Sequence, residues 1–160
     1  MDNFILIDKN TAYYNNEKLK PHIVDAGDPD TWISRFVFFG ENIVVKADNG
    51  EFLKNKNKKT HNQCETEISI TKKIVKKPYH KLFVPIINYG KIKFEDRKWT
   101  YTVSPLLEWS FEEPSLHKDV DLLFVAIKEL KLLDICPYEK RNCAVSKSGR
   151  LFVYDYGLTV

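Results

Sequence analysis

Residues 142–157, with the sequence Asn-Cys-Ala-Val-Ser-Lys-Ser-Gly-Arg-Leu-Phe-Val-Tyr-Asp-Tyr-Gly, are the stretch that decides the fold. Two short apolar runs, at 143–145 and 151–154, flank a Ser-Lys-Ser-Gly turn and predict two strands joined as a hairpin. Asn142 precedes the first strand and Asp155 follows the second, so the turn brings both side chains to the same end of the hairpin. Because magnesium prefers oxygen ligands, the sequence predicts a pair of metal ligands, Asn142 and Asp155, at this end.

Upstream of the hairpin, the apolar pattern from Ser115 to about Leu133 predicts a long helix. Ser115 suits the N-cap, and Asp119 and Asp121 suit the first turn, where carboxylates interact favourably with the helix dipole. Asp134 to Asn142 then reads as a polar loop. The predicted apolar stripe of the helix consists of Leu116, Val120, Leu123, Phe124, Ile127, Leu130 and Leu133.

The first half of the chain has the pattern of antiparallel β structure, with short apolar or alternating runs between Asn, Asp, Gly and Pro clusters. Arg35 to Phe39 and Ile43 to Ala47 are joined by Gly-Glu-Asn, a loop of hairpin length, so these two strands should be neighbours. The strands predicted in this half are Ile5 to Ile7, Ala12 to Tyr14, Lys20 to Asp25, Arg35 to Phe39 and Ile43 to Ala47.

A change of period follows, and Cys64 to Lys77 predicts a second helix. Leu82 to Tyr89 and Trp99 to Val103 read as two more strands around the polar turn Glu95 to Lys98. The second of these strands leads into the connector Ser104 to Leu107. The inward side of the predicted helix would carry Ile68, Ile70, Ile74 and Val75.

Lys46 lies at the end of the apolar strand that closes the first hairpin. A lone lysine is costly to bury there unless it meets a counter-charge or a phosphate. Glu67, or alternatively Glu65, lies near the start of the following helix and is placed to be that counter-charge. A phosphate-transfer site needs a cation for the phosphates, an anion to hold that cation, and oxygen ligands for magnesium. The sequence therefore contains each component of such a site.

Composition limits the other classes of function. The chain has 160 residues, 43% of them hydrophobic and 29% charged, and a net charge of +3, which is typical of one globular domain. The absence of a long apolar run and the acidic N-terminus argue against membrane insertion and secretion, so we expect a cytoplasmic protein. The basic stretch Lys54 to Lys59 reads as a solvated loop, and nucleic-acid binding is not expected. Cys64, Cys136 and Cys143 lack disulfide or zinc spacing and should be reduced thiols.

Together, these motifs resemble those of the protein-kinase-like superfamily. Val44-Val45-Lys46 resembles the kinase strand with its nucleotide-anchoring lysine, and Asp155-Tyr156-Gly157 resembles the Asp-Phe-Gly turn. Asp155 lies thirteen positions after Asn142, the spacing usual in kinases between the catalytic-loop asparagine and that turn. Stretches that look like small kinase-like proteins of bacteria and phages are Ser34 to Phe38, Cys64 to Ile68, Leu82 to Ile86 and Leu151 to Gly157.

The resemblance implies an α+β chain with a protein-kinase-like fold and a single kinase-like domain over 1–160. Residues 1–103 would form an antiparallel β-sheet N-lobe with one helix, 104–107 the hinge, and 108–160 a truncated C-lobe with the long helix and the catalytic-loop hairpin. It implies ATP and Mg²⁺ as cofactors. In that arrangement the phosphates would meet Lys46 and Glu67, the adenine would meet Ser104 and Leu106, and the metal would meet Asn142 and Asp155.

Two departures from the kinase pattern leave the activity open. Five residues before Asn142, where kinases carry the catalytic aspartate, this chain has Pro137, which gives a pseudokinase on a strict alignment. Alternatively, Asp134 to Pro137 resembles the start of the catalytic loop, with three residues inserted before Asn142 and Asp134 as the base. The phosphate loop, Ala26 to Asp30, has one glycine where kinases have three.

Two functions therefore follow from the sequence. The first is a minimal phosphotransferase that uses ATP and magnesium. The alternative is a catalytically inactive pseudokinase, phage-encoded, that acts as a protein-binding regulator or inhibitor in the host cytoplasm. In either case the shortened C-lobe, which ends at Val160, is the surface expected to bind a protein partner or a second copy of the chain.

Overall fold

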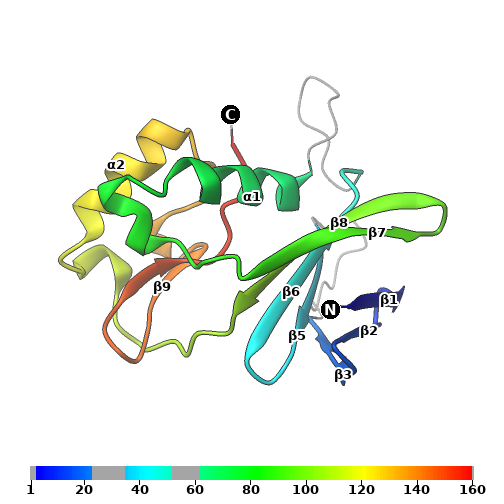
Figure 1. The fold of residues 1–160 in the computed structure, drawn as a ribbon. Coiled ribbons are helices and arrows are strands. Elements are labelled where there is room, and N and C mark those ends of the chain that lie inside the picture. The colour runs from blue at the N-terminus through cyan, green and yellow to red at the C-terminus, as the bar shows by residue number, and fades with distance from the viewer. Residues whose placement is uncertain (1–2, 23–34, 52–61, 160) are drawn as a thin grey trace. The chain divides into compact units, whose positions relative to one another are not determined.

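The computed structural model describes residues 3–22, 35–51 and 62–159 (Figure 1). It divides into two units, described separately below: unit 1 is Met1–Cys64 with Ile86–Leu106, and unit 2 is Glu65–Pro85 with Leu107–Val160. The predicted phosphate loop at 26–30 and the lysine-rich loop at 54–59 lie outside the described residues. Neither α-helix of the described part has the length and apolar character needed to cross a membrane.

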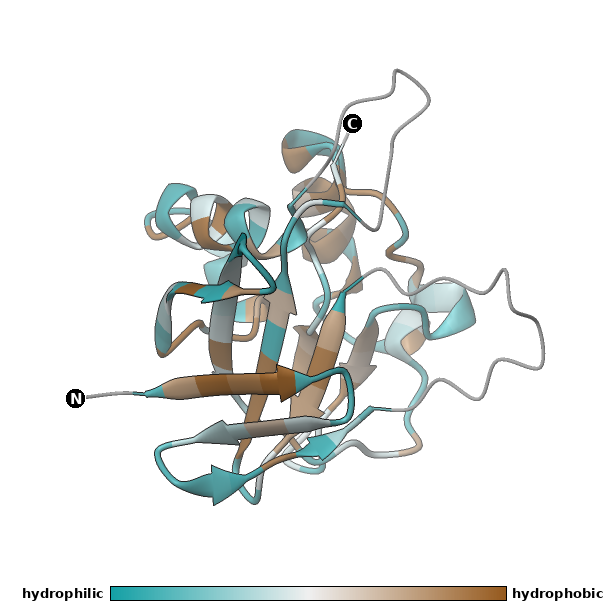
Figure 2. Ribbon diagram, turned by 90° about the vertical axis from the view of Figure 1, so that its right-hand side faces the viewer, coloured by the Kyte–Doolittle hydropathy of each residue, from teal (hydrophilic) through white to brown (hydrophobic). Residues whose placement is uncertain are grey.

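Unit 1 is built from two antiparallel β-sheets. The three-stranded sheet has the order β1-β2-β3, and the five-stranded sheet has the order β4-β5-β6-β8-β7. Figure 2 shows the first sheet lying across one face of the second, with apolar residues on both. The strands are β1 Phe4–Asp8, β2 Thr11–Tyr14, β3 Glu17–Lys18, β4 Lys20–Pro21, β5 Phe36–Phe39, β6 Ile43–Asp48, β7 Asn88–Phe94 and β8 Arg97–Pro105.

The core of unit 1 follows the alternation of side chains along β6. Val45 and Ala47 are fully buried in the cluster between the two sheets, whereas Lys46 and Asp48 alternate with them toward the opposite face. The predicted hairpin is confirmed, because β5 pairs with β6 in antiparallel register and Val37 lies opposite Lys46. The other buried members of this core are Phe4, Leu6, Ala12, Tyr14, Leu19, Phe38, Trp99, Tyr101 and Val103.

Asp48, at the end of β6, anchors the start of helix α1. Its Oδ2 accepts the backbone N–H of Gln63, the first residue of α1, at 2.8 Å, and its Oδ1 accepts the N–H of Gly50 at 2.8 Å. The carboxylate is fully buried, so it satisfies a helix N–H group that has no partner within the helix. Asp48 therefore joins β6 to the first residue of α1 within unit 1.

Replacement of Asp48 by Ala should lower the free energy of unfolding by about 2–4 kcal/mol, because two buried N–H groups lose charge-assisted hydrogen bonds. Urea denaturation followed by circular dichroism measures this loss. Glu41→Ala, which removes an exposed carboxylate from the turn before β6, is the matched control and should change stability by less than about 0.5 kcal/mol. Equal stabilities of the two variants would contradict an anchoring role for Asp48.

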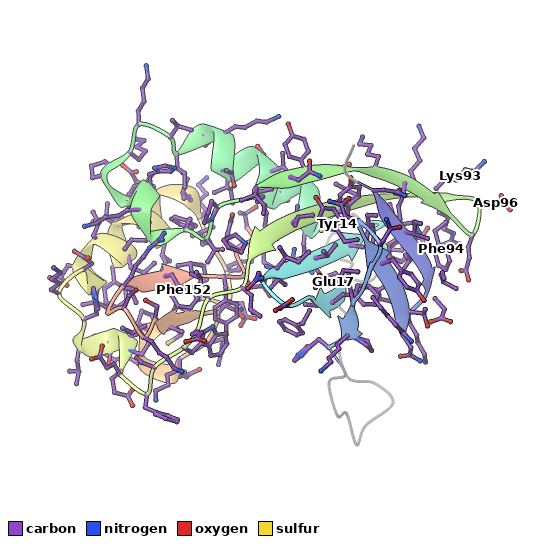
Figure 3. All side chains as sticks on the ribbon, turned by 60° about the horizontal axis from the view of Figure 1, so that its bottom comes forward. Tyr14, Glu17, Lys93, Phe94, Asp96 and Phe152 are labelled. Atoms are coloured by element: carbon purple, nitrogen blue, oxygen red, sulfur yellow. The ribbon has the colours of Figure 1, made fainter. Side chains whose placement is uncertain are left out.

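The β7–β8 hairpin confirms the predicted turn, but β7 begins later than the sequence predicts. Glu95 and Asp96 have φ of 50° and 60°, the conformation of a tight hairpin turn. Figure 3 labels Lys93, Phe94 and Asp96 at the far end of this hairpin. The strand predicted from Leu82 to Tyr89 is wrong. Its first residue ends a 3₁₀ turn, and β7 starts only at Asn88.

The reason for this error is the pairing of residues 83–85. Val84 donates its N–H to the Val153 carbonyl at 3.0 Å, and Phe83 forms an isolated parallel bridge with the same residue. Pro85 follows and has no N–H for a ladder. The apolar run is therefore extended but belongs with β10, which places it in unit 2.

The core of unit 2 lies between its helices and the C-terminal hairpin. That hairpin is confirmed, with Cys143 opposite Val153 and Val145 opposite Leu151. Its turn contains Gly149 at φ 85°, a conformation that side chains resist. The elements are α1 Gln63–Lys73, which starts at the end of unit 1, η1 Pro78–Leu82, η2 Pro114–Leu116, α2 Val120–Leu130, η3 Pro137–Glu139, β9 Cys143–Val145 and β10 Leu151–Val153.

The long helix is shorter than predicted at both ends. Ser115 lies within η2 and is not the N-cap, because the chain is extended at His117 and α2 begins at Val120. The His117 Nδ1 accepts the Asp119 N–H at 3.0 Å and stabilises this break. Lys131, at φ 54°, ends the helix in the left-handed conformation. Of the predicted stripe, Leu123 is fully buried, whereas Leu116, Phe124 and Leu133 are exposed.

Two further boundaries differ from the prediction. Helix α1 ends at Lys73 rather than Lys77, and Val75 is exposed, although Ile70 and Ile74 are buried as expected. The N–H of Lys77 donates to the Ile74 carbonyl, so the last residues form a turn before Pro78. In unit 1, β4 covers only the first two residues of the strand predicted from residue 20 to residue 25, and residues 23–25 lie outside the described part.

Candidate functional site

The end of the β9–β10 hairpin carries the two predicted metal ligands. Asn142 immediately precedes β9, and the Tyr154 N–H donates to its carbonyl at 3.2 Å, which extends the pairing by one residue. Asp155 is the next residue, so the two side chains originate at the same end of the hairpin. Asn142 has φ of 58°, a left-handed conformation that asparagine tolerates better than most residues and that is common at functional sites.

Asp134 lies directly beside Asn142. The Asn142 Nδ2 donates to the Asp134 carbonyl at 2.8 Å and lies 3.4 Å from Asp134 Oδ2. Asp134 also has positive φ, at 63°. With its amide nitrogen engaged by Asp134, Asn142 has its Oδ1 as the atom that can face a cation.

A closed turn accounts for the extra residues between Asp134 and Asn142. Cys136 and Arg141 form an antiparallel bridge, with hydrogen bonds of 3.1 Å and 3.0 Å in the two directions. The intervening residues fold into the short turn η3, and Pro137 within it is buried. The bridge closes the intervening residues into a separate turn. Asp134 and Asn142 are eight positions apart in the sequence, but they are therefore in direct hydrogen-bond contact.

Arg141 sets the local electrostatics of Asp134. Its guanidinium contacts Asp134 Oδ1 at 3.1 Å and also pairs with Glu139. The side chains of Asp134 and Arg141 are about half exposed, at 47% and 50%, so water screens the attraction. The pair therefore orients the carboxylate more than it stabilises the fold.

Glu67 is the buried member of the two glutamates that the sequence leaves open. It is 2% exposed, whereas Glu65 is exposed. Its Oε2 accepts the backbone N–H of Tyr156 at 3.1 Å, so α1 is bonded directly to the residue after Asp155. Sequence reasoning missed this contact, because a backbone amide leaves no signal in the sequence.

Lys46 lies on the central strand of unit 1 and is 8% exposed. Its cross-strand neighbours are Val37 on β5 and Thr102 on β8. A buried ammonium in such a sheet is costly without a charged or polar partner. Lys46 and Glu67 belong to different units, and their pairing on a phosphate stays a prediction.

The predicted hinge residues Ser104 and Leu106 lie at the end of unit 1. Ser104 is still part of β8, opposite Val44. The Leu106 N–H donates to the Asn42 carbonyl at 2.9 Å, so this amide is already engaged within the unit. An adenine at this segment would have to meet another group, such as the Leu106 side chain, which is 39% exposed.

The C-terminal hairpin of unit 2 offers two oxygen donors of the kind that magnesium takes from proteins. Among the described residues, no group of three or more His, Cys, Asp or Glu side chains is arranged to hold a metal ion. Magnesium commonly uses only one or two protein carboxylates and takes its other ligands from phosphates and water. One carboxylate, from Asp155, and one amide oxygen, from Asn142, match this requirement.

Burial keeps the side chains of Cys143 and Tyr154, which are next to Asn142 and Asp155 in the sequence, protonated, so neither acts as a nucleophile at neutral pH. Desolvation, with a smaller contribution from Cys136, raises the pKa of Cys143 to about 11, so the thiol is protonated at neutral pH. Desolvation, followed by the charge of Asp155, raises the pKa of Tyr154 to about 12, so the phenol stays neutral. All three cysteines are free thiols, as predicted.

Comparison with known proteins identifies solved structures of similar fold. No protein-family model matches the chain, and no curated protein sequence matches it. Among solved structures, its mixed α and β architecture with antiparallel sheets is similar to the fold of WbdD. The crystal structure of monomeric WbdD matches with a TM-score of 0.51 and 15% identity, over 98% of this chain and 43% of the WbdD chain.

A second structure of WbdD, described as a bifunctional kinase-methyltransferase, matches with a TM-score of 0.46 and 17% identity, over 98% of this chain and 37% of that chain. This chain therefore spans less than half the length of the WbdD chains that it matches. At these identities the likeness shows the fold alone.

Proposed function

We propose that this chain is an ATP- and magnesium-dependent phosphotransferase. The single observation that carries the proposal is the contact between Asp134 and Asn142, across a closed turn that removes the extra residues from between them. A kinase site needs a carboxylate beside the metal-binding asparagine, to accept or orient the proton of the attacking hydroxyl. Asp134 meets this need, whereas Pro137, the residue at the usual spacing, has no acid or base.

Each of the other residues has one role in this proposal. Asn142 Oδ1 and the Asp155 carboxylate hold the magnesium, which neutralises the phosphate charge when it is bound. Glu67 and Lys46 act on the phosphates, Lys46 as the cation and Glu67 as its counter-charge. Asp134 takes the proton of the acceptor hydroxyl while that oxygen bonds to the γ-phosphorus; the bond from this phosphorus to the β–γ bridging oxygen breaks, and ADP leaves.

The similarity to WbdD adds support from the fold. WbdD is described as a bifunctional kinase-methyltransferase, and the chain matches 43% of the length of monomeric WbdD. A kinase-like fold can also host proteins without activity, so the argument for phosphoryl transfer comes from the residues of the site and not from the fold.

The alternative function, a protein-binding regulator without catalysis, is favoured by one observation. Phe111 is fully exposed and Leu116 is 83% exposed, both in the segment between β8 and α2 of unit 2. Two large apolar side chains exposed within one short segment are a feature of protein-contact sites. A regulator of this kind would not need the contact between Asp134 and Asn142.

Titration of magnesium and ATP into the wild-type chain tests the proposal. At a ligand concentration of one hundred times the dissociation constant, binding should stabilise the fold by about 2.7 kcal/mol, which is measured as a rise in melting temperature. ATP with EDTA in place of magnesium should give much less stabilisation. A wild-type chain that does not bind magnesium and ATP would overturn the enzyme proposal and favour the regulator.

A further inference from the structure

Tyr156 forms a set of hydrogen bonds that the proposed function does not use. The residue is 2% exposed, and its ring packs edge-on against Phe83, with centroids 5.1 Å apart. Its hydroxyl donates to the Val84 carbonyl at 2.9 Å and lies 3.2 Å from the Thr71 Oγ1 of α1. A phenylalanine would keep the ring contact and lose both polar contacts, so this substitution isolates the contribution of the hydroxyl.

These contacts fix the chain on both sides of Asp155. Before it, the Val153 carbonyl accepts the Val84 N–H at 3.0 Å. After it, the Tyr156 hydroxyl donates to the carbonyl of the same Val84. Residues 153 and 156 are therefore both anchored to one residue, and Asp155 lies in the short segment between the two anchors.

Helix α1 adds two attachments to this segment. Glu67 accepts the backbone N–H of Tyr156 at 3.1 Å, and Thr71, one turn further along the same helix face, contacts its hydroxyl. The Thr71 hydroxyl also lies 2.8 Å from the Glu67 carbonyl, to which it can donate. Because each hydroxyl has a single proton, Thr71 donates either to Tyr156 or to Glu67 at any one time.

We propose that the Tyr156 hydroxyl is a positioning group that holds Asp155 in one orientation relative to α1. We name the set of Thr71, Tyr156 and Val84 the tyrosine latch. The proposal rests on the proposed function for its purpose, since a fixed Asp155 serves magnesium binding, but the latch itself is a property of the fold. Catalytic and metal-binding groups need such support, because small errors in placement are costly.

The test compares Tyr156→Phe with Tyr79→Phe. Tyr79 is also 2% exposed in unit 2, and its hydroxyl donates to Glu129 at 2.5 Å, so the control removes one hydrogen-bonded hydroxyl from an equally buried tyrosine that does not contact the segment around Asp155. Amide hydrogen exchange, measured by NMR on ¹⁵N-labelled chain, reports the opening of each residue. Loss of one hydrogen bond of ordinary strength should speed exchange at residues 155–157 about fivefold in Tyr156→Phe.

The expected pattern is local. In Tyr156→Phe the increase should be confined to residues 155–157 and the facing residues of α1, and in Tyr79→Phe these amides should keep the wild-type rates. Thr71→Val, which removes the second hydroxyl and nearly preserves volume, should reproduce the increase in part. Unchanged rates at residues 155–157, or an equal increase in both tyrosine variants, would overturn the latch.

A second readout separates the latch from the proposed function. With ATP present, the magnesium concentration for half-maximal stabilisation should rise about fivefold in Tyr156→Phe and stay unchanged in Tyr79→Phe, a difference that general destabilisation does not produce. Equal magnesium dependence of wild type and Tyr156→Phe would overturn the positioning role. If the wild type binds no magnesium and ATP, the proposed function fails, and amide exchange alone decides whether Tyr156 holds Asp155.

Discussion

Asp134→Asn should lower the turnover number for phosphoryl transfer by about a hundredfold or more, because proton acceptance by a positioned side chain contributes roughly 10²–10⁴ in rate. The asparagine keeps the shape of the side chain and one oxygen that Arg141 can contact, but it cannot take a proton at neutral pH. The affinity for magnesium and ATP should change by no more than about twofold, since Asp134 is not assigned to the metal.

The measurement is the rate of ADP formation with an excess of a hydroxyl-bearing acceptor, or of water if no acceptor is known. Glu139→Gln is the matched control, since it removes the other carboxylate that contacts Arg141 and should leave turnover within about twofold. Pro137→Ala tests the strict alignment, which puts Pro137 at the position of the catalytic aspartate. Because proline has no acid or base function, the alanine variant should keep the wild-type turnover number. Full turnover in Asp134→Asn would rule out Asp134 as the base.

Asp155→Ala should weaken the binding of magnesium and ATP by about a hundredfold or more. The substitution removes the single carboxylate assigned to the metal, and loss of even an outer-shell partner typically costs 10–100-fold in metal affinity. Isothermal titration of magnesium and ATP into wild type and variant measures the difference. Binding of ATP without magnesium should be affected much less, because the alanine removes a negative charge and no phosphate contact.

The control for this experiment is Asp121→Ala, which removes an exposed carboxylate from the first turn of α2 in the same unit. It should bind magnesium and ATP with the wild-type affinity. Circular dichroism of both variants shows whether each is folded before binding is compared. Wild-type affinity in Asp155→Ala would mean that the metal site lies elsewhere.

The sequence by itself determined the local elements whose signals lie within a few residues. The hairpins around residues 40–42 and 146–149 are set by glycine-containing turns between short apolar runs, and the structure confirms both. The placement of Asn142 and Asp155 at one end of the second hairpin follows from the same pattern. The existence of α1 and α2 follows from their apolar periodicity, although their ends do not.

Only the tertiary structure decided which partner each segment takes. The run from Leu82 to Tyr89 has the composition of a strand, but Val84 pairs with β10, and the proline that follows cannot extend a ladder. Helix α2 starts at Val120 and not near the predicted N-cap Ser115, because the side chain of His117 accepts a hydrogen bond from the Asp119 amide. Such contacts depend on neighbours that sequence patterns do not specify.

The candidate site shows the same division. The residue types of a phosphate-transfer site can be found in the sequence, because lysine, glutamate, asparagine and aspartate occur there in recognisable settings. Whether Asp134 or Pro137 lies beside Asn142 could not be decided from spacing, since a loop of seven intervening residues has many conformations. The bridge between Cys136 and Arg141 decided it, because two backbone hydrogen bonds close the intervening turn and leave Asp134 in contact with Asn142.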